Sequence, residues 1–138
     1  MCDEKKIDEL LKTAVLNELE GVEFIQGFDY ATLCREYNGI GPEWAGAKVR
    51  DKVTKYLAVF EPAALIHDMR YAHADGTMLA WQMANREFFT NCTILADATY
   101  PWYSWRRYFA RAAAHALYDA ISTVGGLAAY AKARKENA

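Results

Sequence analysis

The chain has 138 residues, of which 53% are hydrophobic and 25% charged, and its formal net charge is −2. This length predicts a single domain over residues 1–138, and the composition excludes an intrinsically disordered chain. The slightly negative charge argues against a protein that binds nucleic acid non-specifically, because such proteins are normally basic.

No apolar run reaches the ~18 residues that a membrane-spanning helix needs. The charged start of the chain is not followed by an apolar segment, so we expect neither a signal peptide nor a transmembrane segment. The three cysteines, Cys2, Cys34 and Cys92, are odd in number and far apart in the chain. Their spacing favours free cytosolic thiols, with Cys34 and Cys92 in the core, over a metal or redox pair.

In the first half of the chain, the sequence pattern predicts three helices and leaves one segment ambiguous. A helix is expected over residues 4–19, where apolar side chains keep the spacing of one helical face: Ile7, Leu10, Leu11, Ala14, Val15 and Leu19. Residues 20–27 are ambiguous between a short strand and an extended packing segment. Residues 30–37 can form a short helix. The Gly-Ile-Gly-Pro sequence at 39–42 stops any helix, and Pro42 fits the first turn of a new helix over about 43–58.

The second half predicts a helical hairpin and a long final helix. Pro62 suits the first position of a helix over 63–73, and the next helix is expected over 78–95. Because consecutive elements usually pack together, these two helices should form an antiparallel hairpin. A last long helix opens near Pro101 and continues to about residue 124, where the pair Gly125-Gly126 ends it before a short basic helix or tail. The fold class is therefore mainly α.

The segment from His67 to Tyr71, His-Asp-Met-Arg-Tyr, carries the most chemical information. His67 and Tyr71 are four residues apart and lie on one helix face, whereas Asp68 points about 100° away. Apolar neighbours predict that His67 is partly buried, which favours the neutral imidazole that a general base must have. Asn85 is the one polar residue in the apolar stripe of helix 78–95, and pairing it with His67 would satisfy two buried polar groups at once.

Asp68 is expected to face the glycine-containing loop at 37–41. A carboxylate together with backbone carbonyl oxygens is a ligand set that suits Ca²⁺. Each of these parts has a plainer interpretation, since a buried histidine is more often structural and a Gly-x-Gly sequence is more often a turn. Their order along one short chain is what favours a functional site.

Three motifs in order resemble the phospholipase A2 superfamily, most closely the compact, disulfide-free forms of viral capsid, bacterial and phage proteins. They are Tyr-Asn-Gly-Ile-Gly at 37–41, His-Asp-Met-Arg-Tyr at 67–71 and Ala-Asn-Arg-Glu-Phe at 84–88. The resemblance covers about residues 37–92, so the motif-bearing core is about 37–95. It implies a phospholipase A2-like core of two antiparallel helices, with additional helices at both ends of the chain.

The resemblance also implies residue roles. His67 would deprotonate the water that attacks a glycerophospholipid ester, with Asn85 and Tyr71 completing the catalytic network. The implied calcium ligands are Asp68 and the backbone carbonyls of Tyr37, Gly39 and Gly41. Calcium would stabilise the oxyanion that forms during the attack.

Asn85 departs from the family, which has a carboxylate behind the histidine. An amide oxygen can hold the imidazole, but it cannot offset the positive charge that develops on a general base. The sequence thus leaves two functions open. One is a calcium-dependent lipid-ester hydrolase of weak or lost activity, and the alternative is a non-enzymatic phage or virion-associated structural or interaction protein.

A Trp-Tyr-Ser-Trp-Arg-Arg-Tyr-Phe segment opens the last long helix. Aromatic residues interleaved with arginine suit a lipid interface or single-stranded nucleic acid, and the net charge leads us to expect no nucleic-acid partner. Trp102, Trp105, Arg106 and Arg107 are then the first candidates for contact with a phospholipid surface. In the plainer interpretation, Trp102, Trp105 and Phe109 share one helix face and belong to the core, while the arginines are solvated.

Overall fold

The computed structural model describes residues 3–39 and 56–136, and these residues form seven helices and no strand. The helices in chain order are α1 (Glu4–Leu16), α2 (Val22–Gln26), α3 (Tyr30–Glu36), α5 (Leu57–Ala72), α6 (Met78–Thr99), α7 (Trp105–Ile121) and α8 (Val124–Glu136). The described part of the chain is thus mainly α, as the sequence predicts. It contains no helix long and apolar enough to cross a membrane.

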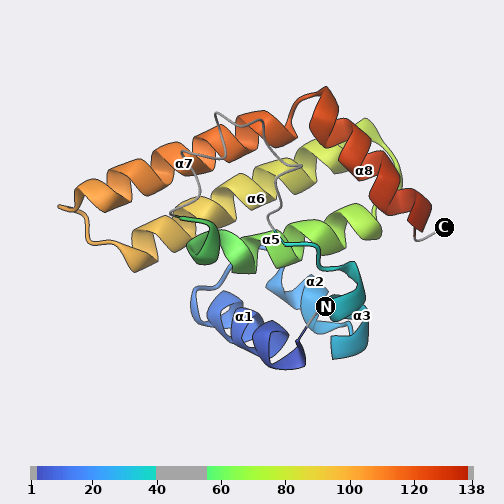
Figure 1. Cartoon of the computed structure of the whole chain (residues 1–138), viewed down its shortest axis with the longest axis horizontal. Helices are drawn as coiled ribbons and strands as arrows, with labels where there is room; N and C mark the ends of the chain where they lie inside the picture. The colour runs from blue at the N-terminus through green and yellow to red at the C-terminus, as the bar shows by residue number, and fades with distance from the viewer. Residues whose placement is uncertain (1–2, 40–55, 137–138) are drawn as a thin grey trace.

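Helices α5, α6 and α7 lie side by side and form the main layer of the molecule (Figure 1). Helix α6 is central, because its most extensive contacts are with α5 on one side and α7 on the other. Helices α1, α2 and α3 pack below α5, and α8 crosses the layer at the end where α7 finishes. The expected antiparallel hairpin of two central helices is confirmed in the packing of α5 against α6.

One continuous core joins α1, α2, α3, α5, α6 and α7. Its fully buried large apolar side chains are Ile7, Ile25, Leu33, Phe60, Leu65, Ile66, Met69, Phe88 and Leu117. Cys92 is a free and buried thiol in this core, as expected. Cys34 is half-buried and disulfide-bonded, so the expectation of a free thiol is wrong for this residue.

The start of α5 differs from the sequence prediction. The helix begins at Leu57 and runs through Pro62, which lies inside it rather than at its first position. Pro62 is the sixth residue of the helix, so it removes the one hydrogen bond to the carbonyl of Ala58, and its ring is buried. Of the helix expected over 43–58, Tyr56 is the N-cap of α5 and residues 57–58 belong to α5, whereas residues 43–55 lie outside the described part of the chain.

The segment at 20–27 is neither a strand nor extended, because Val22–Gln26 forms the short helix α2. Helix α1 ends at Leu16, three residues earlier than expected, and Glu18 adopts a left-handed backbone with φ of 51°. Gly21 precedes α2 with φ of 85°, and a Cβ there would lie 2.8 Å from Cγ2 of Ile66. The chain therefore turns tightly against α5 at a position that requires glycine.

The bounds of α7 and α8 also differ from the sequence prediction. Helix α7 starts at Trp105, where the side chain of Ser104 accepts a hydrogen bond from the backbone N–H of Arg106. Gly125 and Gly126 do not end a helix, because they lie in the first turn of α8. A Cβ on Gly126 would collide with the carbonyl oxygen of Ile121. The glycine at that position thus permits the close approach of α7 and α8.

Asn91 on α6 makes two hydrogen bonds to the backbone of the segment that precedes α2. Replacing Asn91 therefore tests this packing of the fold. Its Oδ1 accepts from the backbone N–H of Glu20 at 2.8 Å, and its Nδ2 donates to the carbonyl oxygen of Glu20 at 2.9 Å. We expect Asn91→Ala to lower the free energy of unfolding by about 2–3 kcal/mol, because both backbone groups lose a partner. Thr93→Ala is the matched control, since its hydroxyl bonds only to the backbone of its own helix. Urea unfolding measures both variants, and equal losses would contradict this role for Asn91.

Candidate functional site

His67, Tyr71 and Asn85 meet in a buried hydrogen-bond network between α5 and α6. The Nε2 atom of His67 lies 2.9 Å from Oδ1 of Asn85, and the hydroxyl of Tyr71 donates to the same oxygen at 2.6 Å. His67 and Asn85 are each only 1% exposed. The structure thus brings together the three residues for which the resemblance implies a catalytic network.

The carbonyl of Ile121, at the end of α7, fixes the orientation of the Asn85 amide. Nδ2 of Asn85 donates to this carbonyl oxygen at 3.2 Å. A carbonyl can only accept, so the amide oxygen must face His67 and Tyr71. It follows that Nε2 of the neutral imidazole carries the proton and that Nδ1 carries the lone pair.

Aromatic rings enclose the imidazole. The ring centroid of His67 lies 4.0 Å from that of Tyr71 and 5.0 Å from that of Phe88. Tyr130 of α8 packs against Tyr71 at 5.1 Å and donates a hydrogen bond to the carbonyl of Thr77. Neither Ile121 nor Tyr130 was predicted as part of the site. Ile121 contributes only its backbone carbonyl, and Tyr130 lies in a helix far along the chain, so neither can be recognised from the spacing of the motifs.

Burial lowers the pKa of His67 to about 4, and the hydrogen bond to Asn85 raises it only partly. Asn85, the described hydrogen-bond partner of the imidazole, is a neutral amide and favours the charged form less than a carboxylate would. At neutral pH His67 is therefore uncharged, the protonation state that a general base needs.

Asp68 faces the loop after α3, as the sequence predicts. Its Oδ2 accepts hydrogen bonds from the backbone N–H groups of Asn38 at 2.8 Å and of Gly39 at 3.2 Å. Gly39 has φ of 72°, so this contact depends on a left-handed backbone that favours glycine. The described part of the loop thus meets the carboxyl group through N–H donors rather than carbonyl oxygens.

The electrostatics of Asp68 are those of a buried acid. Desolvation raises its pKa to about 8, and the two backbone hydrogen bonds only partly oppose this shift. Both of its described partners are neutral, so its charge has no cationic side chain to balance it among them. The described residues hold no cluster of three or more His, Cys, Asp or Glu side chains that could bind a metal. Gly41, another predicted ligand, lies outside the described residues.

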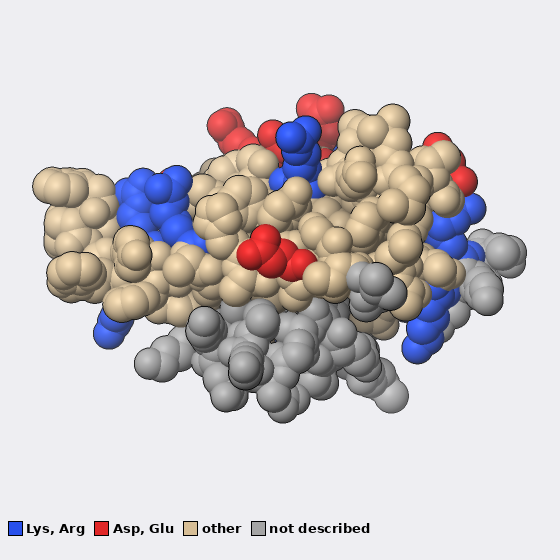
Figure 2. Space-filling view, turned by 90° about the horizontal axis from the view of Figure 1, so that it is seen from above, with Lys and Arg blue, Asp and Glu red and all other residues tan. Residues whose placement is uncertain are grey.

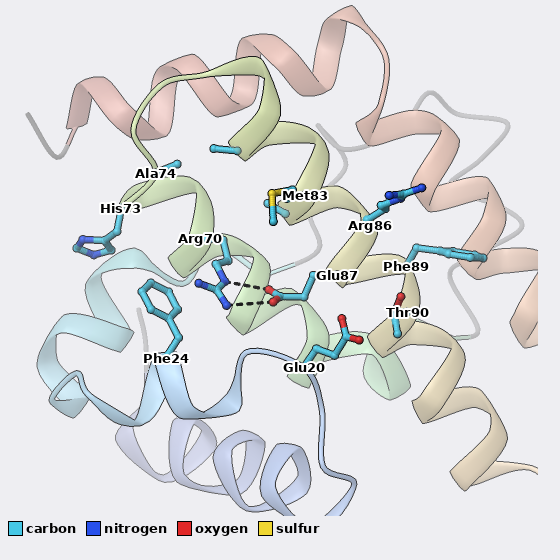
Figure 3. Close-up of a pocket in the computed structure, with 12 residues that line it drawn as sticks. Glu20, Phe24, Arg70, His73, Ala74, Met83, Arg86, Glu87, Phe89 and Thr90 are labelled. Carbon is cyan, nitrogen blue, oxygen red and sulfur yellow. Dashed lines mark hydrogen bonds and ion pairs between the residues drawn. The ribbon is translucent and has the colours of Figure 1, made fainter.

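A separate groove of about 690 Å³ lies between α2, α5 and α6 (Figure 3). Arg70 and Glu87, which line this groove, form an ion pair in which two N···O distances measure 3.0 and 3.1 Å. The ring of Phe24 lies 4.2 Å from the guanidinium carbon of Arg70. The catalytic candidates do not line this groove. His73, which does, is exposed at the end of α5 as expected.

No family model, no curated protein and no solved structure matches the chain. The functional interpretation therefore depends on the motifs and on the geometry of these side chains.

The lowered pKa of His67 predicts an acid-dependent loss of stability. The pKa in the folded state, about 4, is below the value of ~6.5 expected in the unfolded chain. Below the unfolded value, only the unfolded chain takes up the proton. The contribution of His67 to stability is thus complete above about pH 6.5 and declines as the pH falls toward 4.

We expect wild type to lose about 2 kcal/mol more stability than His67→Gln between pH 7 and pH 5. Glutamine keeps an N–H donor for Asn85 but does not titrate. Asp68, whose raised pKa acts in the opposite sense, is common to both proteins and cancels in the comparison. Urea unfolding at the two pH values measures the difference, and parallel pH profiles would show that the imidazole is not buried in its neutral form.

Proposed function

We propose that the protein is a calcium-dependent, phospholipase A2-like lipid-ester hydrolase of low activity. The observation that carries this proposal is the 2.9 Å contact between Nε2 of His67 and Oδ1 of Asn85, on an oxygen that Tyr71 also binds. This contact holds a neutral imidazole with its lone pair on Nδ1. A histidine fixed in this tautomer can act as a general base toward water.

In the proposed reaction, Nδ1 of His67 takes a proton from a water molecule, and the water oxygen attacks the carbonyl carbon of a glycerophospholipid ester. The ester C–O bond then breaks, and the proton passes from the imidazole to the departing glycerol oxygen. The products are a fatty acid and a lysophospholipid. Throughout, Asn85 and Tyr71 prevent rotation of the ring.

Asp68 supports the calcium part of the proposal. It is a hard oxygen ligand, nearly buried, and its described partners are only neutral N–H groups. A carboxyl group whose pKa is raised to about 8 in the absence of a cation is one that a divalent ion would stabilise as the carboxylate. By the resemblance, Asp68 would hold calcium with carbonyls of Tyr37, Gly39 and Gly41. In the described residues Asp68 meets the N–H groups of Asn38 and Gly39 instead, so calcium binding requires the loop to turn carbonyl oxygens toward the ion. The bound ion would supply positive charge opposite the oxyanion.

Asn85 explains why we propose low activity. When the base takes a proton, the imidazolium charge meets an amide dipole rather than a carboxylate. Replacing aspartate by asparagine in the comparable orienting position of serine proteases costs ~10⁴ in turnover. Part of that loss is due to the wrong histidine tautomer, which the Ile121 contact prevents here. The remaining loss is electrostatic.

We expect Asn85→Asp to raise the rate of fatty-acid release from phospholipid vesicles in calcium by about 10-fold or more. The new carboxylate would balance the imidazolium charge. The same change should lower stability by about 1–3 kcal/mol, because a carboxylate oxygen would face the Ile121 carbonyl in place of an N–H donor. Fatty-acid release and urea unfolding measure the two effects separately.

Two loss-of-function variants complete this experiment. His67→Gln keeps the donor to Asn85 and removes the base, and Asp68→Asn removes the negative charge; both should bring the rate to the level seen with a calcium chelator. His73→Gln is the matched control, since His73 is an exposed histidine just after the same helix. Equal rates in wild type, His67→Gln and Asp68→Asn would exclude hydrolysis at this site.

The Asn85–Ile121 contact also favours the second candidate function, a non-enzymatic phage or virion-associated structural or interaction protein. An amide that bonds to three groups from two other helices stabilises the fold without any chemistry. The effect of calcium on stability distinguishes the hydrolase from the structural protein. A bound ion at 100 times its Kd should raise stability by ~2.7 kcal/mol in wild type and not in Asp68→Asn. Absence of both calcium stabilisation and fatty-acid release would select the structural function.

A further inference from the structure

Five exposed aromatic side chains gather where α6 turns into α7. We call them the aromatic tip: Trp102, Tyr103, Trp105, Tyr108 and Phe109. Their exposed fractions are 82%, 73%, 77%, 65% and 52%, in that order. The interpretation in which Trp102, Trp105 and Phe109 belong to the core is therefore wrong. An exposed apolar patch of this density is rare on a soluble protein without a binding partner.

The tip is exposed because it projects beyond the core. It forms the end of the α6–α7 hairpin, at the opposite end of the molecule from α8 (Figure 1). The buried positions of α7 begin only at Ala110 and are mostly alanine. Such small residues let α7 approach α6 closely. The large rings precede them in the chain, at the end of the hairpin that extends past α5 in Figure 1.

The tip is held in place before any partner binds. Two arginines of α7 share one carboxylate of α6: Nε of Arg107 and Nε of Arg111 lie 2.8 and 3.2 Å from Oδ1 of Asp97. The rings of Trp102 and Tyr103 meet edge to face, with their centroids 5.7 Å apart. A surface ordered in this way loses little conformational entropy on binding.

Positive charge accompanies the aromatic rings. Residues 97–111 contain three arginines and one aspartate, a local net charge of +2 in a chain whose total is −2. In Figure 2, a cluster of basic side chains lies directly beside the uncharged end of the molecule. The tip thus combines an apolar surface with a basic rim.

We propose that the aromatic tip anchors the protein to a membrane surface that contains anionic lipids. Tryptophan and tyrosine favour the headgroup level of a bilayer, where one part of the ring is in an apolar environment and the other is hydrated. Arg106 and its neighbours would contact the lipid phosphates, because anionic headgroups attract basic side chains at the membrane surface.

Other partners fit this surface less well. Single-stranded nucleic acid is bound in a basic groove that follows the strand, with rings as stacking platforms along it. The tip is a projecting hairpin end, and its net positive charge is small. A protein partner would need a groove shaped to this projecting hairpin end, whereas a bilayer surface adapts to a projection.

The proposed anchoring goes beyond hydrolysis and does not depend on it. Helix α7 separates the tip from Ile121 beside the catalytic candidates, and its 17 residues span about 25 Å. Variants of the tip therefore leave the His67 network untouched. A failure of membrane binding and a failure of catalysis can be observed independently.

The test is partition of the full chain onto vesicles of phosphatidylcholine with and without phosphatidylglycerol, measured by flotation. We expect binding that depends on phosphatidylglycerol. Trp102→Ala combined with Trp105→Ala should lower the partition coefficient by about 10-fold or more. Arg106→Gln should lower it by about fivefold on anionic vesicles and leave the weak binding to neutral vesicles unchanged.

Leu16→Ala is the matched control, because Leu16 is 82% exposed, the same as Trp102, and belongs to α1 rather than to the α6–α7 hairpin. It should bind as wild type does. His67→Gln should also bind normally, which separates anchoring from catalysis. All tip variants replace exposed side chains, so their thermal unfolding should match that of wild type.

Three results would overturn the proposal. The first is no binding of wild type to either vesicle, and the second is equal binding by wild type and the double tryptophan variant. The third is tip-dependent binding of a single-stranded oligonucleotide or of a second copy of the chain without vesicle binding, which would assign the tip to another partner.

Discussion

The amide of Asn85 is the interaction on which the rest of the site depends. One side chain on α6 accepts from His67 and Tyr71 of α5 and donates to the carbonyl of Ile121 at the end of α7. Only a group with both an acceptor and a donor can make these contacts, so a carboxylate would lose the bond to α7. The same residue thus fixes the histidine tautomer, links three helices and limits the charge that the imidazole can bear.

Burial favours the uncharged forms of the adjacent residues His67 and Asp68 on α5. It does so by lowering the pKa of the histidine and raising the pKa of the aspartate. The pKa of His67 falls to about 4, while that of Asp68 rises to about 8. Between these values the site holds little net charge, which limits the cost of placing two titratable groups in the interior. A cation bound at Asp68 would stabilise the carboxylate and so add charge to the site. If the network is purely structural, we expect no increase in stability from a cation.

The local patterns in the sequence predicted the centre of the molecule well. One histidine on an apolar helix face and one amide in the apolar stripe of the next helix were enough to predict the contact of His67 with Asn85, because helix periodicity and hairpin packing leave few alternatives. The bond from Tyr71 to the same amide was implied only by the family resemblance. Elsewhere tertiary contacts override the local signals. Pro62 continues a helix because the core buries its ring, and Gly126 lies at the start of a helix because Ile121 leaves no room for a Cβ. Helical periodicity also groups Trp105 and Phe109 on one face, but it cannot show whether another helix covers that face.

The His67 network and the aromatic tip lie at opposite ends of α7, and this separation constrains how the two proposed functions could work together. The tip marks the start of this helix, and Ile121 beside the His67 network marks its end. With α7 perpendicular to a bilayer, the network would lie about 25 Å from the headgroups that the tip contacts. With α7 parallel to the surface, both ends would reach the lipid. A hydrolase anchored by the tip must therefore lie along the membrane, whereas a structural protein could stand on it.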